Sequence, residues 1–215
     1  MKQGLEACYL HPRAVVGSLS FHLGRVSQNE SIHQGYNQVV EDALLSTIDW
    51  TSNGYELYNI ASFDPSSRYG FYQCPAESNA LFMPRKLWKE YGGFERQFRS
   101  KGGGLVNLDL WRRVCEDDRN LTIILLGEGT FHQFHGGVAT NAVVDKWPEF
   151  HAEYRNIRSL EYRVPWRKPV LFGKMNPWAL SFEERVRREQ AIDLEQISVK
   201  PIAEVDAKTE ISAGF

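Results

Sequence analysis

"LVNLDLWRRVCEDDRNLTIILLG" (residues 105–127) is the stretch that decides the fold. Its first half predicts a helix from about Asn107 to Asp117, because apolar side chains recur there at helical spacing. The inner face of this helix consists of Leu108, Trp111, Val114 and Cys115. The second half, "LTIILLG" (121–127), is an apolar run ended by glycine, which predicts a buried strand. A helix that leads into a buried strand is typical of α/β proteins.

Strands and helices alternate along the preceding part of the chain. Apolar runs predict strands at 13–24, 55–63 and 77–83, and helical spacing predicts helices at 37–50 and 84–93. The inner face of the helix at 37–50 is expected to contain Val40, Ala43, Leu44 and Ile48. The predicted class is therefore α/β, with a mixed sheet flanked by helices.

The pattern changes after residue 146. Residues 147–163 predict a surface helix with Pro148 near its start, and Ser181 stands in capping-box spacing with Glu184 before a second helix. The end of the chain has the composition of a disordered tail. We expect an α/β domain at 1–146, a helical extension packed on it at 147–200, and the tail at 201–215.

Composition excludes several classes of protein. The 215 residues are 42% hydrophobic, which is enough for a sizeable core. The 25 Lys and Arg residues against 27 Asp and Glu give a net charge of -2, which does not favour nucleic acid or anionic lipid. The three cysteines form no CxxC pair, which indicates a reducing compartment, and no apolar run is long enough to span a membrane. We expect a soluble, cytoplasmic protein that does not bind nucleic acid.

Three segments combine glycines with polar side chains near predicted strand ends. They are "PAESNALFMP" (75–84), "GGFERQFRSKGGG" (92–104) and "LLGEGTFHQFHGGVATN" (125–141). Ligands of open α/β sheets bind at strand ends, and glycine allows the backbone to approach a ligand closely. Histidine and glutamate bind metals or transfer protons. The spacing of these residues alone does not identify a reaction.

Residues 77–141 resemble the acceptor-side half of family 2 glycosyltransferases of the GT-A fold. In that family a strand leads into an arginine, a tryptophan and a Gly-Gly-Phe motif, followed by a glycine-rich loop and a helix with an acidic start. The counterparts here are Arg85, Trp88, Gly92, Gly93, Phe94, Glu95, Phe98, Asp109, Leu110 and Arg113. The resemblance implies a partial GT-A-like, Rossmann-like mixed sheet with a helical C-terminal extension.

The resemblance also implies a function. A sugar would pass from a nucleotide-sugar donor to a glycan or other hydroxyl acceptor, as in polysaccharide biosynthesis. A divalent cation, Mn or Mg, would neutralise the diphosphate, and a carboxylate would deprotonate the acceptor hydroxyl. Peripheral contact with a membrane and a homodimer are both left open.

The resemblance suggests site residues in three groups. Asp109, at the start of a predicted helix, is the first candidate for the catalytic base, followed by Glu128; Glu77 is a third carboxylate for the same role. The expected substrate contacts are Glu77, Asn79, Gly103, Gly104 and Asn107. His132 and His135 are the expected metal ligands. Asn107 and Asp109 also suit the first turn of a helix, where Asn is a good N-cap and an acid at N2 is favoured for stability alone.

Two departures from the family pattern leave alternatives open. The sequence contains no Asp-x-Asp motif, and Val106 and Asn107 stand where the family has an acidic pair. We therefore expect either the C-terminal part of a larger enzyme or a non-catalytic remnant that binds a sugar or a partner. A metal-dependent hydrolase is a further alternative, with His132, His135, Glu128 and Asp109 as its site.

Overall fold

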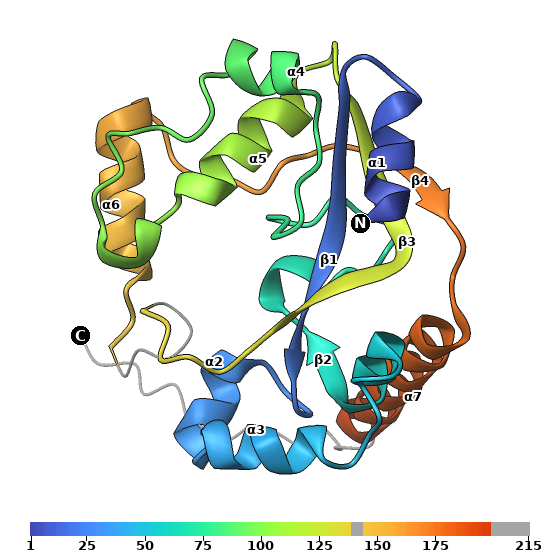
Figure 1. Cartoon of the computed structure of the whole chain (residues 1–215). Helices are drawn as coiled ribbons and strands as arrows, with labels where there is room; N and C mark the ends of the chain where they lie inside the picture. The colour runs from blue at the N-terminus through green and yellow to red at the C-terminus, as the bar shows by residue number, and fades with distance from the viewer. Residues whose placement is uncertain (139–143, 199–215) are drawn as a thin grey trace, which may run out of the picture. The chain divides into compact units, whose positions relative to one another are not determined.

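The computed structural model describes residues 1–138 and 144–198. A four-stranded mixed sheet with the order β2-β1-β3-β4 forms its centre (Figure 1). The strands are β1 (Ala14–Leu23), β2 (Ala61–Phe63), β3 (Leu121–His132) and β4 (Val170–Gly173). β1 and β4 run parallel to β3, whereas β2 runs antiparallel to β1. The prediction of an α/β protein with a mixed sheet flanked by helices is confirmed.

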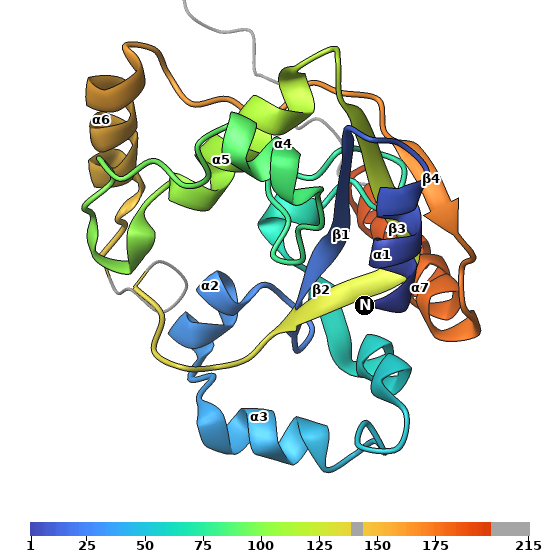
Figure 2. The same ribbon diagram turned by 45° about the horizontal axis from the view of Figure 1, so that its top comes forward.

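Helices and short 3-10 turns connect the strands. The helices are α1 (Lys2–Tyr9), α2 (Gln28–Ser31), α3 (Gln38–Leu45), α4 (Arg85–Glu90), α5 (Val106–Glu116), α6 (Trp147–Arg158) and α7 (Pro177–Ser198). The 3-10 turns are η1 (Ile32–Gln34), η2 (Gly54–Ile60), η3 (Pro65–Ser67) and η4 (Lys101–Gly103). Figure 1 and Figure 2 show α4 and α5 on one side of β1 and α1 on the other.

The core forms around β1, whose ten residues are all buried. At the beginning of the strand, Ala14 and Val16 pack against Ala7 of α1 and against Ile123 and Leu125 of β3. Toward the end of β1 an aromatic cluster replaces this aliphatic packing. Phe21 stacks with Phe63 and Phe131 at ring-centroid distances of 5.4 and 5.3 Å, while Tyr58 and Phe182 meet it edge-on. Offset and edge-on aromatic contacts of this kind stabilise a core beyond the area that they bury.

Several predicted elements differ from the structure. Residues 55–60 form η2 instead of a strand, because the side chain of Asn53 accepts a hydrogen bond from the amide of Tyr55 and starts a 3-10 turn. Residues 77–83 make only an isolated bridge between Val16 and Phe82. The hydroxyl of Ser78 bonds to the backbone of neighbouring segments and so replaces part of a regular strand ladder.

The helix predicted at 37–50 ends at Leu45 and has a different inner face from the expected one. Val40 and Ala43 are exposed, whereas Glu41 is buried. The carboxylate of Glu41 accepts hydrogen bonds from the hydroxyl of Tyr36 and the amide of Phe134. These partners make the burial of a charged group tolerable, so tertiary contacts override the apolar pattern of the helix.

Residues 1–182 form one compact unit, and the remainder of α7 belongs to a second unit that begins at Glu183. The segment expected as a helical extension also contributes a strand, because β4 pairs with β3 from Ile123 to Leu126. α7 begins at Pro177, before Ser181, and Asn176 accepts a hydrogen bond from the amide of Ala179 at its start. The tail predicted at 201–215 lies outside the described residues. No helix in the described part of the chain is long and apolar enough to cross a membrane.

Candidate functional site

Three strands end in the same pattern, a phenylalanine between two polar residues. The segments are Ser20-Phe21-His22 of β1, Ser62-Phe63-Asp64 at the end of β2, and Thr130-Phe131-His132 at the end of β3. Successive side chains of a strand point to opposite faces, and the register pairs Phe21 with both Phe63 and Phe131. The three phenylalanines therefore stack on one face of the sheet. Their polar neighbours share the opposite face.

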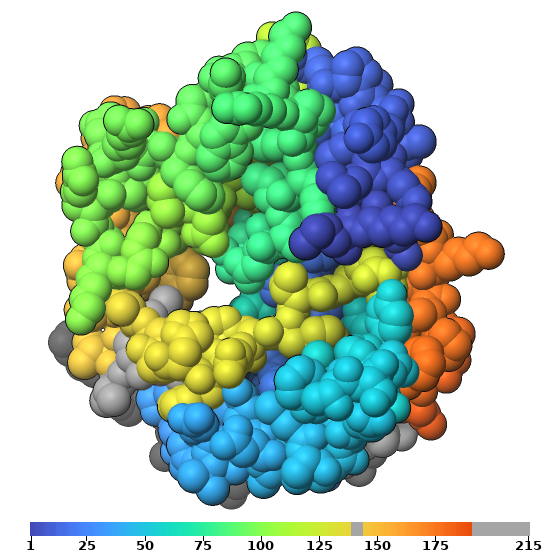
Figure 3. Space-filling model, viewed as in Figure 1, coloured from blue at the N-terminus to red at the C-terminus, as the bar shows by residue number. Residues whose placement is uncertain are grey.

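A cleft of about 630 Å³ lies beside this polar face, next to the carboxyl ends of the parallel strands β1 and β3. Its polar lining includes Asp64, Glu77, Asn79, Asn107, His132 and His135. Its aromatic lining is Trp147, Phe150, His151 and Tyr162. Figure 3 shows the surface hollowed between the segment that follows β3, in yellow, and the green segments.

Asp64 is held at the wall of the cleft by His22. The Nε2 atom of His22 lies 2.7 Å from Oδ2 of Asp64, and its Nδ1 accepts a hydrogen bond of 2.7 Å from the amide of Gln28. Because Nδ1 accepts, a neutral imidazole carries its proton on Nε2, the nitrogen next to the carboxylate. Burial alone would raise the pKa of Asp64, but His22 and the amide and side chain of Ser66 outweigh it and lower the pKa. Asp64 is therefore a fixed negative charge.

Glu77 lies half-buried in the cleft, and the side-chain amide of Asn107 donates a hydrogen bond to its Oε2. Burial and the neighbouring charge of Asp64 raise the pKa of Glu77 to about 7, although the hydrogen bond from Asn107 acts in the opposite direction. A carboxyl group that titrates near neutral pH can accept a proton from a bound hydroxyl. Glu77 is therefore a carboxyl group of this cleft whose pKa lies close to neutrality.

His132 and His135 line the same cleft, with their ring centroids 5.0 Å apart. The ring of His132 also lies 5.3 Å from that of His22. Burial, together with the imidazoles of His22 and His135, lowers the pKa of His132, so its neutral form predominates at pH 7. Within residues 1–138 and 144–198, however, no group of three or more His, Cys, Asp or Glu side chains is arranged to hold a metal ion.

The glycine-rich loop is shaped by α6. Glu153 accepts hydrogen bonds of 2.5 and 2.9 Å from the amides of Arg99 and Ser100. Gly104 has a φ of +53°, and a Cβ at this position would lie 2.9 Å from Oε2 of Glu153. Gly104 borders the cleft, whereas Gly103 lies in η4 and does not line it. The absence of a side chain at Gly104 thus has a structural cause before any ligand is considered.

Asp109, the first candidate for the base, does not reach the cleft. Its side chain is fully buried, and the guanidinium groups of Arg113 and Arg158 donate three hydrogen bonds of 2.7–2.8 Å to its two oxygens. A carboxylate that is enclosed in this way has no route to an acceptor hydroxyl. α5 begins at Val106 after Leu105, so Asn107 is not the N-cap either. Asp109 pairs with Arg113 of α5 and with Arg158 of α6, and its catalytic role stays a prediction.

Glu128, the second candidate for the base, lies in β3 and lines a different, smaller cavity of about 290 Å³. Its Oε1 accepts hydrogen bonds from the hydroxyl of Tyr55 at 2.7 Å and from the side-chain amide of Gln3 at 3.0 Å. The structure therefore brings together Glu77, Asn79, Asn107, Gly104 and the two histidines, and it separates Asp109 and Glu128 from them.

Sequence reasoning missed His22 and Asp64. The signal that could have found them is the strict alternation in "SLSFHL" (18–23) and "SFD" (62–64), in which every second residue is polar. On a strand, such alternation places the polar residues on one face. Tyr162, whose hydroxyl donates to the carbonyl of Ala76, was also missed, and no sequence pattern marks it.

Comparison with protein-family models, with curated proteins and with solved structures yields no match for this chain. A function therefore has to be inferred from the cleft itself. The cleft combines a polar face of the sheet, a carboxyl group with a pKa of about 7 and amide side chains beside that group.

Proposed function

We propose that this chain forms the acceptor side of a glycosyltransferase, in which Glu77 takes a proton from a hydroxyl of a glycan bound in the cleft. The observation that carries the proposal is the geometry of Glu77. Its carboxylate is oriented by Asn107 and stands in a cleft whose volume suits a ligand of a few sugar units. The resemblance of residues 77–141 to family 2 glycosyltransferases supports the same function, and a mixed α/β sheet is compatible with part of a GT-A fold.

The proposed reaction assigns one role to Glu77. The acceptor hydroxyl oxygen forms a bond to the anomeric carbon of the donor sugar, and the bond from that carbon to the leaving nucleoside diphosphate breaks with its electron pair. The hydroxyl proton passes to the carboxylate of Glu77, which later releases it to water. A base is most effective when its pKa lies near the working pH, and the pKa of Glu77 at about 7 meets this condition.

The amide side chains provide contacts that suit sugar hydroxyls. The Nδ2 atom of Asn79 donates a hydrogen bond of 3.1 Å to the hydroxyl of Ser20, which orients the carboxamide. Its Oδ1 can then accept from a ligand hydroxyl. Trp147, which is 42% exposed, and Tyr162 add aromatic surface to the same cleft. Aromatic surface next to amide and carboxylate groups is a combination that binds polyhydroxylated ligands.

Asp64 raises the pKa of the proposed base, Glu77. Its negative charge disfavours ionisation of Glu77 and so strengthens Glu77 as a proton acceptor. His22, in turn, keeps Asp64 ionised. The nucleotide-sugar donor and the divalent cation remain predictions from the resemblance, and none of the steps above uses the cation. The free state of Cys8, Cys74 and Cys115 agrees with a cytoplasmic location.

Two other functions receive less support from the cleft. A sugar-binding remnant would have no need of a carboxylate that titrates near neutral pH. A metal-dependent hydrolase built on Asp109, Glu128 and the two histidines conflicts with the separation of Asp109 and Glu128 from the cleft.

The proposal is tested by transfer assays on the full chain. Radiolabelled UDP-, GDP- and dTDP-sugars are incubated with a panel of oligosaccharide acceptors, with and without Mn²⁺. We expect the Glu77→Gln variant to lower kcat by about 100-fold or more, because general base catalysis typically contributes a factor of that size. Glu128→Gln is the matched control, since Glu128 lines a separate cavity, and it should keep the activity of the parent chain. Transfer that is unaffected by Glu77→Gln would contradict the role of Glu77, and a chain that neither transfers a sugar nor binds any of the oligosaccharide acceptors would contradict the proposal as a whole.

A further inference from the structure

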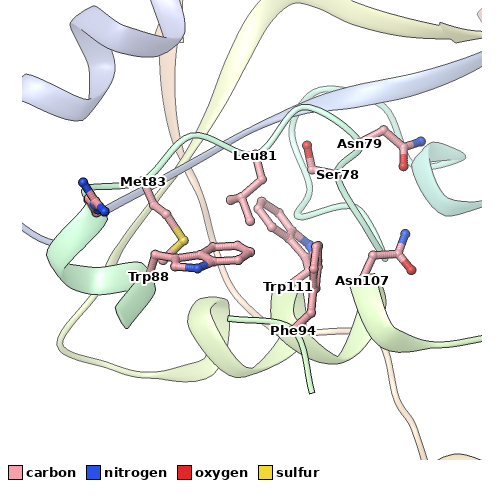
Figure 4. Close-up of a pocket in the computed structure, with 9 residues that line it drawn as sticks. Ser78, Asn79, Leu81, Met83, Trp88, Phe94, Asn107 and Trp111 are labelled. Carbon is pink, nitrogen blue, oxygen red and sulfur yellow. The ribbon is translucent and has the colours of Figure 1, made fainter. Parts of the chain in front are cut away.

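A second pocket of about 490 Å³ adjoins the cleft. Asn79 and Asn107 line both cavities, so the two spaces meet at these amide side chains. Figure 4 shows Asn79 and Asn107 at one end of the second pocket, with Trp88 and Met83 at the other. A ligand longer than one unit could therefore extend from the cleft, past the two amides, toward Trp88. We call this cavity the Trp88 pocket.

The Gly-Gly-Phe motif builds the outer end of the Trp88 pocket. A Cβ on Gly93 would lie 2.8 Å from the Cε2 and Cζ2 atoms of Trp88, so the indole packs directly on the glycine backbone. The ring of Phe94 meets the same indole edge-on at a centroid distance of 5.2 Å. Gly93 therefore supports the indole and Phe94 restricts its rotation, so that Trp88 forms a fixed aromatic wall.

The inner end of the Trp88 pocket is rigid. Trp111 is buried, and its Nε1 donates a hydrogen bond of 2.9 Å to the carbonyl of Pro75. Ser78 lines the same end, and its hydroxyl donates to the carbonyl of Ser18. Neither side chain has to move to admit a ligand. A pocket that is formed before binding loses little free energy through ordering when the ligand enters.

We propose that the Trp88 pocket binds the sugar unit next to the reacting unit of the acceptor, so that the acceptor is at least a disaccharide. This inference rests on the proposed function and adds the substrate class to it. The reacting unit occupies the cleft beside Glu77, the glycosidic linkage passes Asn79 and Asn107, and the second ring stacks on Trp88.

The mixed lining favours a sugar over an apolar aglycone. Leu81, Met83, Trp88 and Phe94 would accept an alkyl chain, but Asn79 and Asn107 stand at the entrance from the cleft and Arg85 lines the same pocket. An alkyl chain would remove water from these polar groups without giving them hydrogen-bond partners, which is unfavourable. A sugar ring offers hydroxyls to the polar groups and C–H groups to the indole face.

The test uses NMR of the full chain with ¹⁵N-labelled tryptophan and histidine. The signals of Trp88 and His132 report on the Trp88 pocket and on the cleft, respectively. Probes are a panel of neutral monosaccharides, the corresponding disaccharides and the octyl glycosides of the same monosaccharides. We expect monosaccharides to shift only the His132 signals and at least one disaccharide to shift both. We expect Phe94→Ala, at a side chain that is 49% exposed, and Trp88→Ala to weaken disaccharide binding by about tenfold. Monosaccharide binding should not change in either variant.

Trp166→Ala is the matched control, because Trp166 is 89% exposed and does not line the Trp88 pocket. Disaccharides that shift His132 but never Trp88 would overturn the inference and leave the proposed function intact. An octyl glycoside that shifts Trp88 and binds as tightly as the best disaccharide would overturn it in favour of an apolar aglycone. If no sugar shifts His132, the proposed function fails together with the inference.

Discussion

The imidazole of His22 and the carboxylate of Asp64 meet at 2.7 Å on the polar face of the sheet, and the amide of Gln28 fixes the other ring nitrogen. His22 is fully buried and does not line the cleft. It affects the cleft through Asp64, whose negative charge raises the pKa of Glu77. The effect of Asp64 on the pKa of Glu77 can be tested by substitution.

Removing the charge of Asp64 should weaken the base. We expect Asp64→Asn to lower the pKa of Glu77 from about 7 toward its ordinary value, because the like charge that disfavours ionisation of Glu77 is gone. Titration of the ¹³C-labelled Glu77 carboxyl by NMR measures this change. Asp118→Asn, at a carboxylate that is 92% exposed, serves as the control and should leave the titration curve unchanged. A Glu77 pKa that rises in Asp64→Asn would show that the two carboxylates do not interact as described.

Glu77 should reduce the stability of the fold at high pH. The folded protein keeps the proton on Glu77 up to about pH 7, whereas the unfolded chain loses it near pH 4.5. Ionisation of Glu77 therefore lowers the free energy of unfolding as the pH rises from about 4.5 to about 7. We expect the change in the free energy of unfolding caused by Glu77→Gln to be more favourable at pH 8 than at pH 4 by about 2 kcal/mol. This is less than the full pKa shift implies, because Glu77 is partly exposed. Urea unfolding at the two pH values gives the difference, and an equal effect at both would refute the raised pKa.

Replacing the buried Asp109 should destabilise the fold more than replacing an exposed aspartate. Asp109→Ala leaves Arg113 and Arg158 without their shared carboxylate, and we expect the free energy of unfolding to fall by about 3 kcal/mol. Asp118→Ala removes an exposed ion pair with Arg167, so its effect should stay below about 1 kcal/mol. Denaturant unfolding of both variants measures the contrast. A loss of transfer activity in Asp109→Asn without any loss of stability would restore Asp109 as a candidate catalytic group.

Two adjacent glycines separate backbone strain from side-chain packing. Gly92 and Gly93 have φ values of +70° and +64°, but a Cβ on Gly92 meets nothing within 4 Å, whereas one on Gly93 lies 2.8 Å from Trp88. Ala at either position should cost about 1 kcal/mol through the positive φ. We expect Gly93→Ala to cost about 1 kcal/mol more, through the clash with Trp88, and to change the near-ultraviolet circular dichroism of the indole. Equal effects of the two substitutions would mean that Gly93 does not support Trp88.

The sequence predicted the strongly patterned elements well and the weakly patterned ones poorly. β1, α4 and α5 follow from apolar periodicity and from proline or glycine near their ends. β3 follows from its apolar run, but it continues past Gly127, where its end was predicted, to His132. β4 has only four residues in a proline-broken segment, and no local signal separates it from a loop. The false strand at 55–60 arose because alternating apolar residues also suit a 3-10 turn when Asn53 starts one.

The sequence predicted only part of the candidate site. The expectation that Glu77, Asn79, Asn107 and the two histidines lie in one place came from strand ends and a family pattern, and these residues do line one cleft. The choice among the carboxylates could not be made from the sequence. This choice depends on whether arginine side chains enclose a carboxylate, as they do at Asp109. Arg158, one of these arginines, is distant from Asp109 in the sequence.

The three Phe-centred strand ends serve the core and the cleft at once. Phe21, Phe63 and Phe131 hold the strands in register, and each immediately neighbours a polar residue that faces the other way. Inserting or deleting one residue in any of these segments would turn a phenylalanine toward the cleft and a histidine or aspartate into the core. The spacing of these segments is therefore constrained more tightly than the identity of any single polar side chain. A protein engineer who wishes to alter the chemistry of the cleft can exchange the polar residues but has to keep the length of every strand.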